Sequence, residues 1–503
     1  MNSFILKKIK LMTRILKYLA VGLTASCINI TLNAQQQRFQ PAWESLKNYK
    51  IPEWFRDAKF GIFIHWGVYS VPAFENEWYP RNMYVKDSKE YKHHVEKYGP
   101  QSKFGYKDFI PMFKAEKFYA NNWVELFKKA GAKYIVPVAE HHDGFAMYNT
   151  ALSRWNAFNM GPHRDIIGEL AEATRKANLI FGLSSHRVEH WWFMGGGRSF
   201  DSDVNDSSYQ DFYGPAQAHS PFDSIKAPVI STEYMNDWLL RNVELVEKYH
   251  PDLFWFDWWI EQKEMEPYRK SFASFYYNNA IELSKEVVIN FKHESYPENT
   301  AVLDIERGKL AGIRPLAWQT DDAIGNKSWG FTNDNTFKSP QYVVTNLIDI
   351  VSKNGNLLLN IGPRSDGTIT DEETNVLLGT GKWLAVNGEA IYATRPWKIY
   401  GEGPTESASG EFKTQTPFTS KDIRFTTKGD TLYAITLALP PAGEIVTIKS
   451  LSSIAGNGAV ASVELIGGSQ KVNWSQKKNA LLIKPGGNYP SEYAAAYRIT
   501  FKK

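Results

Sequence analysis

The residue pattern with the clearest chemical content is a carboxylate placed among aromatic side chains. Asp257 follows a short apolar run, within the sequence WFDWW (Trp255–Trp259). A buried carboxylate is costly unless it is paired or used, so Asp257 is a candidate nucleophile, with a salt bridge to a nearby Lys or Arg as the structural alternative. Tryptophan faces stack on the apolar side of a pyranose, and an ionised carboxylate can attack or stabilise its anomeric carbon. The pattern therefore favours chemistry on a sugar.

Glycoside hydrolysis also requires a second carboxyl group, which protonates the departing oxygen and needs a raised pKa for that task. Three glutamates follow Asp257 in the expected region: Glu294, Glu298 and Glu306. Spacing alone does not choose among them.

Further polar and aromatic groups occur where other apolar runs end. They are His65-Trp66-Gly67, Glu77-Trp78-Tyr79 in the loop that follows, Glu140-His141-His142-Asp143, Ser184-Ser185-His186-Arg187 and Asp304-Ile305-Glu306-Arg307. A single histidine or tryptophan at a strand end is more often structural than functional. Their convergence on the strand ends, where barrel enzymes carry their chemistry, favours a functional site.

A metal centre and a serine nucleophile are weaker alternatives. His141, His142 and Asp143 are adjacent in sequence, and adjacent side chains on a strand point to opposite faces, so they do not readily share one ion. The sequence contains no HExxH helix, no Cys ligand set and no GxSxG elbow. We therefore predict neither a bound metal nor a cofactor.

These residues need an architecture that brings strand ends together. Eight short apolar, β-branched or aromatic runs predict strands, at Lys59–Trp66, Tyr134–His142, Ile180–His186, Leu253–Trp259, Val287–Lys292, Val302–Arg307, Leu316–Asp322 and Gly355–Pro363. Helical patterns lie between several of them, at Trp123–Ala130, Asp165–Lys176, Asp237–Tyr249 and Pro340–Val351. Continuous apolar strands imply a parallel sheet covered by helices. We predict an α/β fold with a (β/α)8-like TIM-type barrel over residues 35–397.

The sequence pattern changes after Pro396. Gly401–Gly410 has the composition of a loop, and strict alternation of apolar and polar residues then begins at Thr431–Leu437. Further short strands are predicted at Glu444–Lys449, Val460–Ile466, Ala480–Ile483 and Ala496–Phe501. This pattern is typical of a small antiparallel β-sandwich, which we place over residues 398–503.

The first 34 residues predict a cleaved signal peptide. Their charged side chains are all basic, and the uncharged run Leu19–Leu32 is shorter than the roughly 20 residues that a membrane span needs. Cleavage near Ala34 predicts export, to the periplasm or beyond, and lipidation at Cys27 is the less favoured alternative. Without this segment 53 basic and 54 acidic side chains remain, which gives a net charge of −1. A chain without excess positive charge shows no electrostatic sign of binding to nucleic acid or to an anionic membrane.

Blocks of the sequence from about Trp43 to Trp397 resemble glycoside hydrolase family 29, the α-L-fucosidases. The most specific are KFGIFIHWGVYSVPAF (Lys59–Phe74), EWYPRNMY (Glu77–Tyr84), EHHDGFAMYNT (Glu140–Thr150), LFWFD (Leu253–Asp257), VSKNGNLLLNIGPRSDGTI (Val351–Ile369) and WLAVNGEAIYATRPW (Trp383–Trp397). Several independent blocks in the family's order make a chance similarity improbable.

The resemblance implies a catalytic barrel with a carboxy-terminal β-sandwich. It also implies exo-acting, retaining release of terminal L-fucose from a fucosylated oligosaccharide or glycoconjugate. Asp257 falls on the family's nucleophile, and Glu306 falls in the segment that supplies the acid/base, where DIERG resembles the family's pattern. The family's sugar contacts correspond to His65, Glu77, Trp78, His141, His142 and Trp255. The sequence carries no signal for an oligomeric state.

The chain departs from the family's usual pattern at three places. Glu140 stands where a lysine is usual before the paired histidines, the run Ser184–Arg187 replaces an aromatic residue, and Lys292 stands where relatives often have an arginine. These departures leave two alternatives to a fucosidase open. One is a hydrolase of a fucose-like sugar such as an α-L-galactoside, and the other is a non-catalytic carbohydrate-binding relative.

Overall fold

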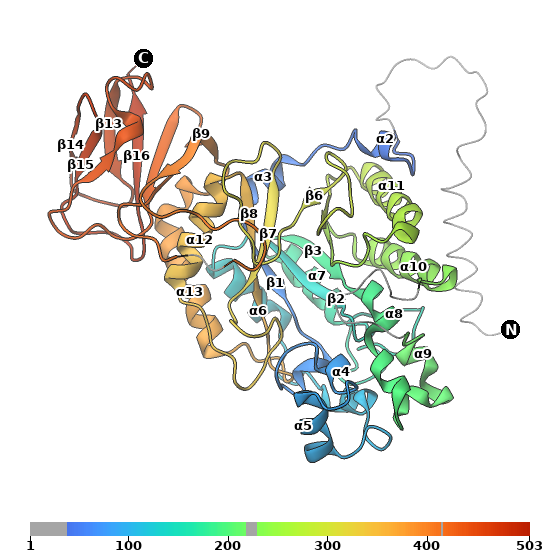
Figure 1. The fold of residues 1–503 in the computed structure, drawn as a ribbon. Coiled ribbons are helices and arrows are strands. Elements are labelled where there is room, and N and C mark those ends of the chain that lie inside the picture. Colours follow the sequence, from blue (N-terminus) through green and yellow to red (C-terminus); the bar gives the residue numbers. More distant parts are fainter. Residues whose placement is uncertain (1–37, 218–228, 414–415, 503) are drawn as a thin grey trace, which may run out of the picture.

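The computed structural model of the chain describes residues 38–217, 229–413 and 416–502. The predicted signal peptide and Cys27 lie outside these ranges. Within them the chain forms a helix-covered barrel followed by a smaller β-sandwich at the C-terminal end (Figure 1). No helix in the described ranges has the length and apolar character needed to cross a membrane.

The barrel is one parallel sheet that, in the described residues, contains eight strands and is nearly closed. Its strands follow the order β6-β5-β4-β3-β2-β1-β8-β7, and a parallel bridge between Asp304 and Gln319 joins the β6 and β7 sides. The bounds are β1 Phe60–Ile64, β2 Tyr134–Glu140, β3 Ile180–Ser185, β4 Leu253–Phe256, β5 Val288–Phe291, β6 Val302–Leu303, β7 Trp318–Ala323 and β8 Gly355–Ile361. The predicted (β/α)8-like fold is confirmed, and each strand is shorter than, or as long as, its predicted run.

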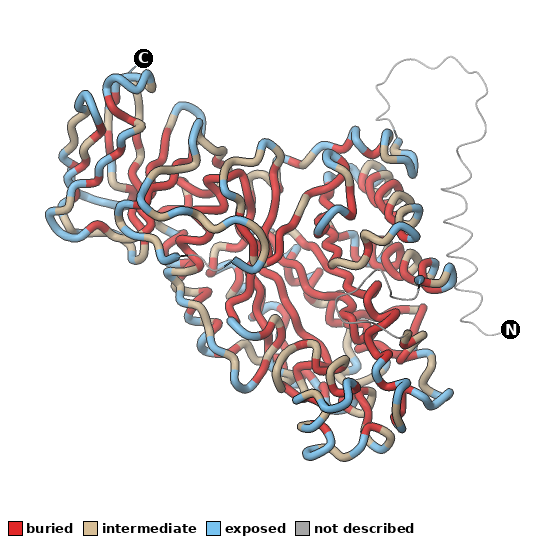
Figure 2. The backbone as a smooth tube through the Cα atoms, in the orientation of Figure 1, coloured by how far each residue is buried: buried red, intermediate tan, exposed pale blue. Residues whose placement is uncertain are grey.

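The barrel interior is filled by side chains. Every residue of β1, β2 and β8 is buried, in agreement with their continuous apolar runs (Figure 2). A Cβ atom on Gly61 would lie 2.4 Å from the ring of Tyr134, so only glycine fits at this point of β1. The Tyr134 hydroxyl donates to Gln319 across the barrel at 2.8 Å. This packing fixes the strands so that their carboxyl ends meet at one rim.

Some helices pack around the outside of the barrel, and others precede β1 or lie in the connections that follow β1 and β3. Their bounds are α2 Trp43–Leu46, α3 Glu53–Ala58, α4 Tyr79–Asn82, α5 Lys89–Tyr98, α6 Ala120–Lys129, α7 Ile166–Lys176, α8 His190–Phe193, α9 Gln210–Tyr213, α10 Thr232–Tyr249, α11 Glu266–Glu282, α12 Pro340–Ser352 and α13 Asp371–Asn387. Side-chain oxygens of Asp165, Ser231, Ser339 and Thr370 accept hydrogen bonds from the first turns of α7, α10, α12 and α13. Helices α6, α7, α10 and α12 correspond to the predicted patterns, whereas α11 and α13 were not predicted.

The sandwich consists of two antiparallel sheets. In the described residues a five-stranded sheet has the order β13-β16-β11-β10-β9 and a three-stranded sheet the order β12-β15-β14. The bounds are β9 Arg395–Glu402, β10 Ile423–Lys428, β11 Thr431–Thr436, β12 Val446–Ile448, β13 Val460–Leu465, β14 Asn473–Gln476, β15 Leu481–Lys484 and β16 Ala495–Phe501. Side chains from both sheets, including Phe425, Leu432 and Leu481, form one buried cluster. Strand β9 spans the predicted boundary between residues 397 and 398.

A buried ion pair joins the sandwich to the barrel. The Oδ1 atom of Asp349, on α12, lies 2.6 Å from the Nε atom of Arg424 on β10. Its Oδ2 atom lies 2.8 Å from the Nζ atom of Lys353. Burial alone would raise the pKa of Asp349, but Lys353 and Arg424 outweigh it and hold the pKa below its usual value. Removing one partner of a buried ion pair leaves an uncompensated charge, which makes this contact important for stability.

Replacing Arg424 with methionine tests this junction. Asp349 would keep Lys353 but lose the cation from the sandwich, so we expect the free energy of unfolding to fall by about 3–5 kcal/mol. Urea unfolding at neutral pH, followed by tryptophan fluorescence, measures the change. Arg498 is the control, because it pairs with Glu389 and Glu464 while its side chain is 38% exposed. Arg498→Met should lower the free energy of unfolding by about 1 kcal/mol or less. Equal losses in the two variants would contradict our interpretation.

Candidate active site

The predicted site residues gather at the carboxyl-terminal rim of the barrel. His65 follows β1, His141 and His142 follow β2, and Asp257 follows β4, while Glu306 lies just beyond β6. All five side chains are buried. Parallel strands place their carboxyl ends side by side, which explains how residues more than two hundred positions apart in the chain meet here.

Asp257 is surrounded by nitrogen atoms. On one side, the Nδ1 atom of His186 lies 2.9 Å and the Nε2 atom of His142 lies 3.3 Å from its Oδ2 atom. On the other side, the Nζ atom of Lys292 lies 3.4 Å from Oδ1, which also accepts a hydrogen bond from the Trp258 amide at 3.0 Å. Burial alone would raise the pKa of Asp257, but Lys292 and His186 outweigh it and hold the pKa well below its usual range. Asp257 is therefore ionised at neutral pH.

Lys292 connects Asp257 to a second carboxyl group. Its Nζ atom lies 2.6 Å from the Oε2 atom of Glu306 and 3.3 Å from the Oδ2 atom of Asp321. Because one ammonium contacts both acids, the Oδ1 atom of Asp257 and the Oε2 atom of Glu306 are at most about 6 Å apart. Carboxyl separations of about 5–5.5 Å accompany retention of configuration, and about 6.5–9.5 Å accompany inversion. The spacing therefore fits a retaining pair.

Glu306 has the environment that a general acid requires. Burial raises its pKa, and the charge of Asp257 adds to this effect, against the opposing influence of Lys292. The other two candidates, Glu294 and Glu298, are both exposed, and Glu298 pairs with Arg314 at 3.1 Å. Of the three candidates, Glu306 is the one that contacts Lys292.

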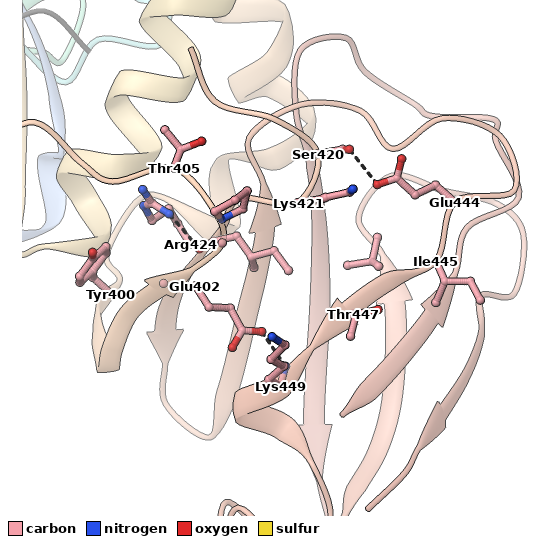
Figure 3. Close-up of a pocket in the computed structure, with 15 residues that line it drawn as sticks. Tyr400, Glu402, Thr405, Ser420, Lys421, Arg424, Glu444, Ile445, Thr447 and Lys449 are labelled. Carbon is pink, nitrogen blue, oxygen red and sulfur yellow. Dashed lines mark hydrogen bonds between the residues drawn. The ribbon is translucent and has the colours of Figure 1, made fainter. Parts of the chain in front are cut away.

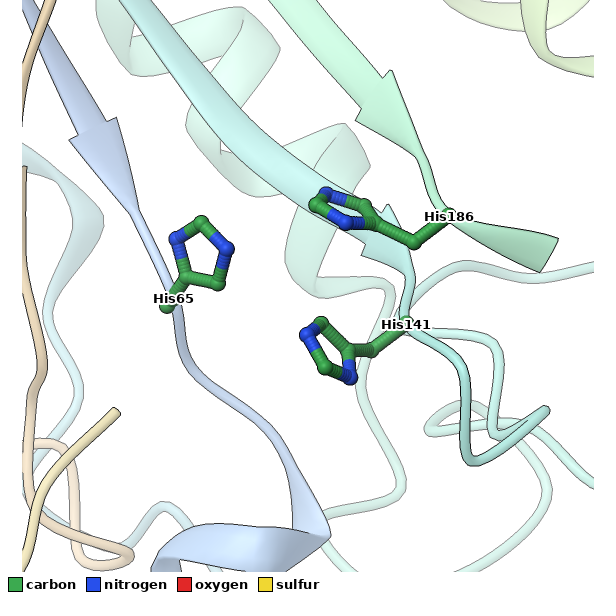
Figure 4. A group of neighbouring side chains, drawn as sticks. All are labelled: His65, His141 and His186. Atoms are coloured by element: carbon green, nitrogen blue, oxygen red, sulfur yellow. The ribbon is translucent and has the colours of Figure 1, made fainter. Parts of the chain in front are cut away.

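Three imidazoles face one another beside Asp257 (Figure 4). The ring centroid of His186 lies 4.9 Å from that of His141 and 5.3 Å from that of His65. The centroids of His65 and His141 are 5.6 Å apart. Burial lowers the pKa of all three, that of His186 to about 4, so they are neutral at pH 7. The Nδ1 atom of His65 lies 2.7 Å from the Oδ1 atom of Asn360, which fixes its tautomer and leaves Nε2 as an acceptor.

His186 links Asp257 to the end of β3. An ionised carboxylate accepts hydrogen bonds only, so the Nδ1–H of neutral His186 donates to Asp257. Its Nε2 atom then accepts from the Ser184 hydroxyl, 2.9 Å away. Sequence reasoning placed His186 at a strand end but assigned it no contact with Asp257.

His142 differs from its neighbours in charge. Its Nδ1 atom lies 3.2 Å from the Oε2 atom of Glu189 and 2.9 Å from the carbonyl oxygen of His186. Burial would lower the pKa of His142, but Glu189 and Asp257 outweigh it and raise the pKa to about 9. An imidazolium therefore lies between two acids at neutral pH.

Two groups of described side chains have the types and spacing that a metal ion uses. They are His65, His141 and His186, and His142, His186 and Asp257, with ligand atoms within 4.8 Å of one another in each group. Adjacent His141 and His142 thus fall in different groups, and Asp143 instead accepts a hydrogen bond from Tyr106 at 2.7 Å. Nitrogen-rich sets of this kind suit zinc, although both ring nitrogens of His186 already have hydrogen-bond partners. The absence of a metal stays a prediction.

Glu77 reaches the rim from the loop after β1 and is held by the loop after β7. Its Oε2 atom accepts hydrogen bonds from the Ser328 hydroxyl at 2.8 Å and from the Trp329 amide at 2.9 Å. The Trp329 ring centroid lies 5.3 Å from that of His65 and 5.9 Å from the Nζ atom of Lys292. Strand-end reasoning missed Trp329 because it lies within a loop rather than at the end of β7.

Trp78 and Trp255 provide aromatic faces on two sides of the site. The Trp78 ring centroid lies 5.7 Å from that of His142. Trp255 is two residues before Asp257, so both side chains point to the same face of β4. Its Nε1 atom donates to Asp304 at 2.9 Å, and the Lys292 ammonium lies 4.8 Å from its ring centroid. Each predicted sugar contact therefore lies within this one cluster or against it.

A separate cavity of about 670 Å³ lies in the sandwich, along β9, β10 and β12 (Figure 3). Tyr400, Thr405 and Ile445 are among its lining residues, and no predicted site residue lines it. Its glutamates already accept hydrogen bonds, Glu402 from the Lys449 amide and Glu444 from the Ser420 hydroxyl. The predicted site residues therefore lie at the barrel rim and not in this cavity.

Known proteins resemble this chain over most of its length. The sequence profile described as Alpha-L-fucosidase matches residues 26–389, and that described as Alpha-L-fucosidase C-terminal domain matches residues 415–502. The chain belongs to the alpha-L-fucosidase family. Tissue alpha-L-fucosidase of Rattus norvegicus is 31% identical over 480 residues, covering 92% of each chain, and plasma alpha-L-fucosidase of Homo sapiens is 33% identical over 463 residues, covering 89% of this chain and 88% of the relative. The crystal structure of Thermotoga maritima alpha-fucosidase superposes with a TM-score of 0.75 at 30% identity, covering 92% of this chain and 100% of that one.

Residues from two of the departures from the usual fucosidase pattern contact each other. Glu140 pairs with Arg187, from the altered run after β3, and with Arg241 of α10 at 3.1 Å. Asp237 contacts the same two arginines, at 2.9 and 2.8 Å. The negative charges of Glu140 and Asp237 are therefore matched by the positive charges of Arg187 and Arg241, in a network between β2, β3 and α10.

The protonation states of the four site histidines can be measured directly. At pH 7 we expect His142 to be an imidazolium and His65, His141 and His186 to be neutral, because Glu189 and Asp257 raise the pKa of His142 to about 9 while burial lowers the others. Nitrogen-15 spectra of histidine-labelled enzyme across the neutral and alkaline range, with His142→Asn for assignment, report each ring.

The same raised pKa has a consequence for stability. The contribution from His142 is fully present below its ordinary pKa of 6.5 and is lost as the pH rises through about 9. The difference in melting temperature between the enzyme and His142→Asn should therefore shrink over that window. A His142 signal that titrates near 6.5 would contradict the assigned charge.

Proposed function

We propose that this chain is an exo-acting, retaining α-L-fucosidase that hydrolyses terminal L-fucose from fucosylated glycans by double displacement. Asp257 acts as the nucleophile and Glu306 as the acid/base. The observation that carries the proposal is the Lys292 ammonium, which contacts an ionised Asp257 at 3.4 Å and Glu306, whose pKa is raised, at 2.6 Å. Two carboxyls at retaining distance in opposite protonation states are the minimum machinery of the reaction.

The first displacement forms a covalent intermediate. Glu306 donates its proton to the glycosidic oxygen, the bond between this oxygen and the anomeric carbon breaks, and a carboxylate oxygen of Asp257 bonds to that carbon. The leaving sugar departs with the proton. Lys292 and the His142 imidazolium stabilise the Asp257 carboxylate before attack, and Lys292, which also contacts Glu306, stabilises the carboxylate that Glu306 becomes once it has given up its proton.

The second displacement releases fucose. Glu306, now ionised, takes a proton from water as the water oxygen attacks the anomeric carbon, and the bond to Asp257 breaks. Inversion at each step restores the original configuration. Asp257 returns as a carboxylate and Glu306 as an acid, so the protons and electrons balance over the cycle.

The fucose ring is proposed to lie against the buried cluster at the rim. His65, Glu77, His141 and His142 would bond its hydroxyls, and Trp78 and Trp255 would cover its apolar faces. The Nε2 atom of His65 is left as an acceptor by its tautomer, and the Nδ1 atom of His141 is buried without a hydrogen-bond partner in the described structure. Both are polar groups that a hydroxyl would satisfy.

The proposed substrates are glycans outside the cytoplasm. The basic residues Lys7–Lys17 followed by the apolar run Leu19–Leu32 support export through a signal peptide, to the periplasm or beyond, with a lipid anchor at Cys27 as the less favoured form. An α-L-galactoside keeps the same hydroxyl arrangement and adds one oxygen, so a substrate panel should include it beside fucosides.

Asp257→Asn tests the nucleophile. We expect release of 4-nitrophenol from its α-L-fucoside to fall by at least about a thousandfold, because the amide cannot form the intermediate. With Asp257→Gly, azide should enter the vacated space and give the β-fucosyl azide, whose inverted configuration identifies the missing group.

Asp252 offers a matched control at the opposite end of the same strand, where it pairs with Lys285 at 3.0 Å. Asp252→Asn should retain wild-type turnover. Circular dichroism and melting temperature confirm that each variant is folded. A folded Asp257→Asn enzyme with full turnover would make the nucleophile assignment wrong.

Glu306→Gln tests the acid/base. We expect kcat/KM for a fucosylated disaccharide to fall by about 10²–10⁴-fold. The loss for α-L-fucosyl fluoride should be much smaller, because fluoride leaves without a proton. Activity of the unmodified enzyme should decline as rising pH removes the proton of Glu306, whose pKa is raised, and this alkaline decline should be absent from the variant.

Glu298→Gln is the control, because Glu298 is an exposed alternative candidate that pairs with Arg314. It should leave both substrates and the pH profile unchanged. Loss of the alkaline decline in Glu298→Gln but not in Glu306→Gln would transfer the role to Glu298.

A further inference from the structure

The C-terminal domain sends part of its chain to the active-site rim. Residues 403–413, which follow β9, leave the five-stranded sheet and reach the barrel. Gly410 forms an antiparallel bridge with Lys309, with backbone N–O distances of 3.2 and 2.9 Å in the two directions. Two residues later, the Phe412 amide donates to the carbonyl oxygen of Glu306 at 3.4 Å. We call Gly410–Phe412 the crossing segment.

The crossing segment also reaches the side of the site where Asp257 lies. The Oε2 atom of Glu411 is 3.6 Å from the Nε2 atom of His293, the residue after Lys292. The opposite ring nitrogen of His293 is 3.8 Å from the Oε1 atom of Glu261, and its ring centroid lies 5.6 Å from that of Trp258. The segment therefore contacts Glu306 and His293, the residue after Lys292, and His293 in turn packs against Trp258, the residue after Asp257.

Phe412 has two properties that packing alone does not explain. Its side chain is 56% exposed, although it belongs to a segment that is hydrogen-bonded to the barrel. Its φ angle is +53°, in the left-handed region that bulky residues rarely adopt and that costs on the order of 1–3 kcal/mol. His293 and Arg307, at φ +55° and +42°, share this conformation on the barrel side of the contact. Strained backbone of this kind clusters at ligand sites.

In the proposed reaction, the group released from fucose lies beside Glu306. A general acid must contact the oxygen of the leaving group, so the group released from fucose lies on the Glu306 side of the site. This is also the side on which the crossing segment lies. An aromatic face stacks on a pyranose, and the partly exposed Glu411 and His293 can bond its hydroxyls.

Resting on the proposed function, we propose that Phe412 and Glu411 form the leaving-group subsite and favour substrates in which L-fucose is attached to another sugar. The C-terminal domain then takes part in substrate selection through the crossing segment. The recorded contact between Phe412 and Glu306 is a backbone hydrogen bond, which replacement of the Phe412 side chain leaves in place.

Phe412→Ala separates leaving-group binding from catalysis. We expect kcat/KM for a disaccharide of α-linked L-fucose and galactose to fall about tenfold, chiefly through KM, because a stacking contact of that size is lost. The value for α-L-fucosyl fluoride, which has no leaving sugar, should stay within about twofold of the unmodified enzyme. Phe412→Trp restores an aromatic face and should recover most of the disaccharide activity.

Ile454→Ala is the matched control, because Ile454 is an apolar side chain of the same domain and is 70% exposed. It should change neither substrate. An unchanged disaccharide-to-fluoride ratio in Phe412→Ala would overturn the subsite, and so would an equal loss on both substrates, which would show that Phe412 acts on Glu306. If the unmodified enzyme cleaves neither substrate, the result contradicts the proposed function itself, and the subsite proposal, which rests on that function, is rejected together with it.

Discussion

The arrangement of the site depends on one buried ammonium group among carboxylates. Lys292 is 2% exposed, and its Nζ atom lies within 3.4 Å of oxygens of Asp257, Glu306 and Asp321. Without a cation, three carboxylates in this volume would repel one another and take up protons. With Lys292 present, Asp257 stays ionised, whereas burial and neighbouring acids raise the pKa of Glu306 and Asp321. One cation thus supports the two opposite protonation states that the proposed mechanism needs.

The barrel produces this arrangement through strand order. Asp257 follows β4, Lys292 follows β5, Glu306 lies beyond β6 and Asp321 lies in β7, and these strands are neighbours around the barrel. The cation is therefore placed between acids by the fold itself. A lysine ammonium is a compact charge that can contact several acids at once, whereas a planar guanidinium favours paired bonds to one carboxylate. Lys292 accordingly contacts three carboxylates with one ammonium group.

The sequence was sufficient for features that depend on local pattern. Continuous apolar runs predicted the barrel strands, and the tryptophans around Asp257 indicated a functional carboxylate. Helix α11 was missed because its buried face carries Arg269 and Ser274 as well as aromatic residues, so its apolar periodicity is weak. The contacts of Lys292, His186 and the crossing segment join residues that are distant in sequence, and only the fold brings them together. For the same reason, spacing could not separate Glu306 from Glu294 and Glu298.

The departures from the family pattern are better explained by repacking than by loss of function. Glu140 is a buried acid whose charge is matched by Arg187, from the altered run, and by Arg241 of α10. His186, from the same run, donates to Asp257, and Lys292 contacts the other oxygen of that carboxylate. A protein that only binds sugar has no need to keep a buried carboxylate ionised at the cost of several cationic and hydrogen-bonding partners. Two of the three departures, His186 and Lys292, make contacts of this kind with Asp257, which supports the nucleophile role proposed for it.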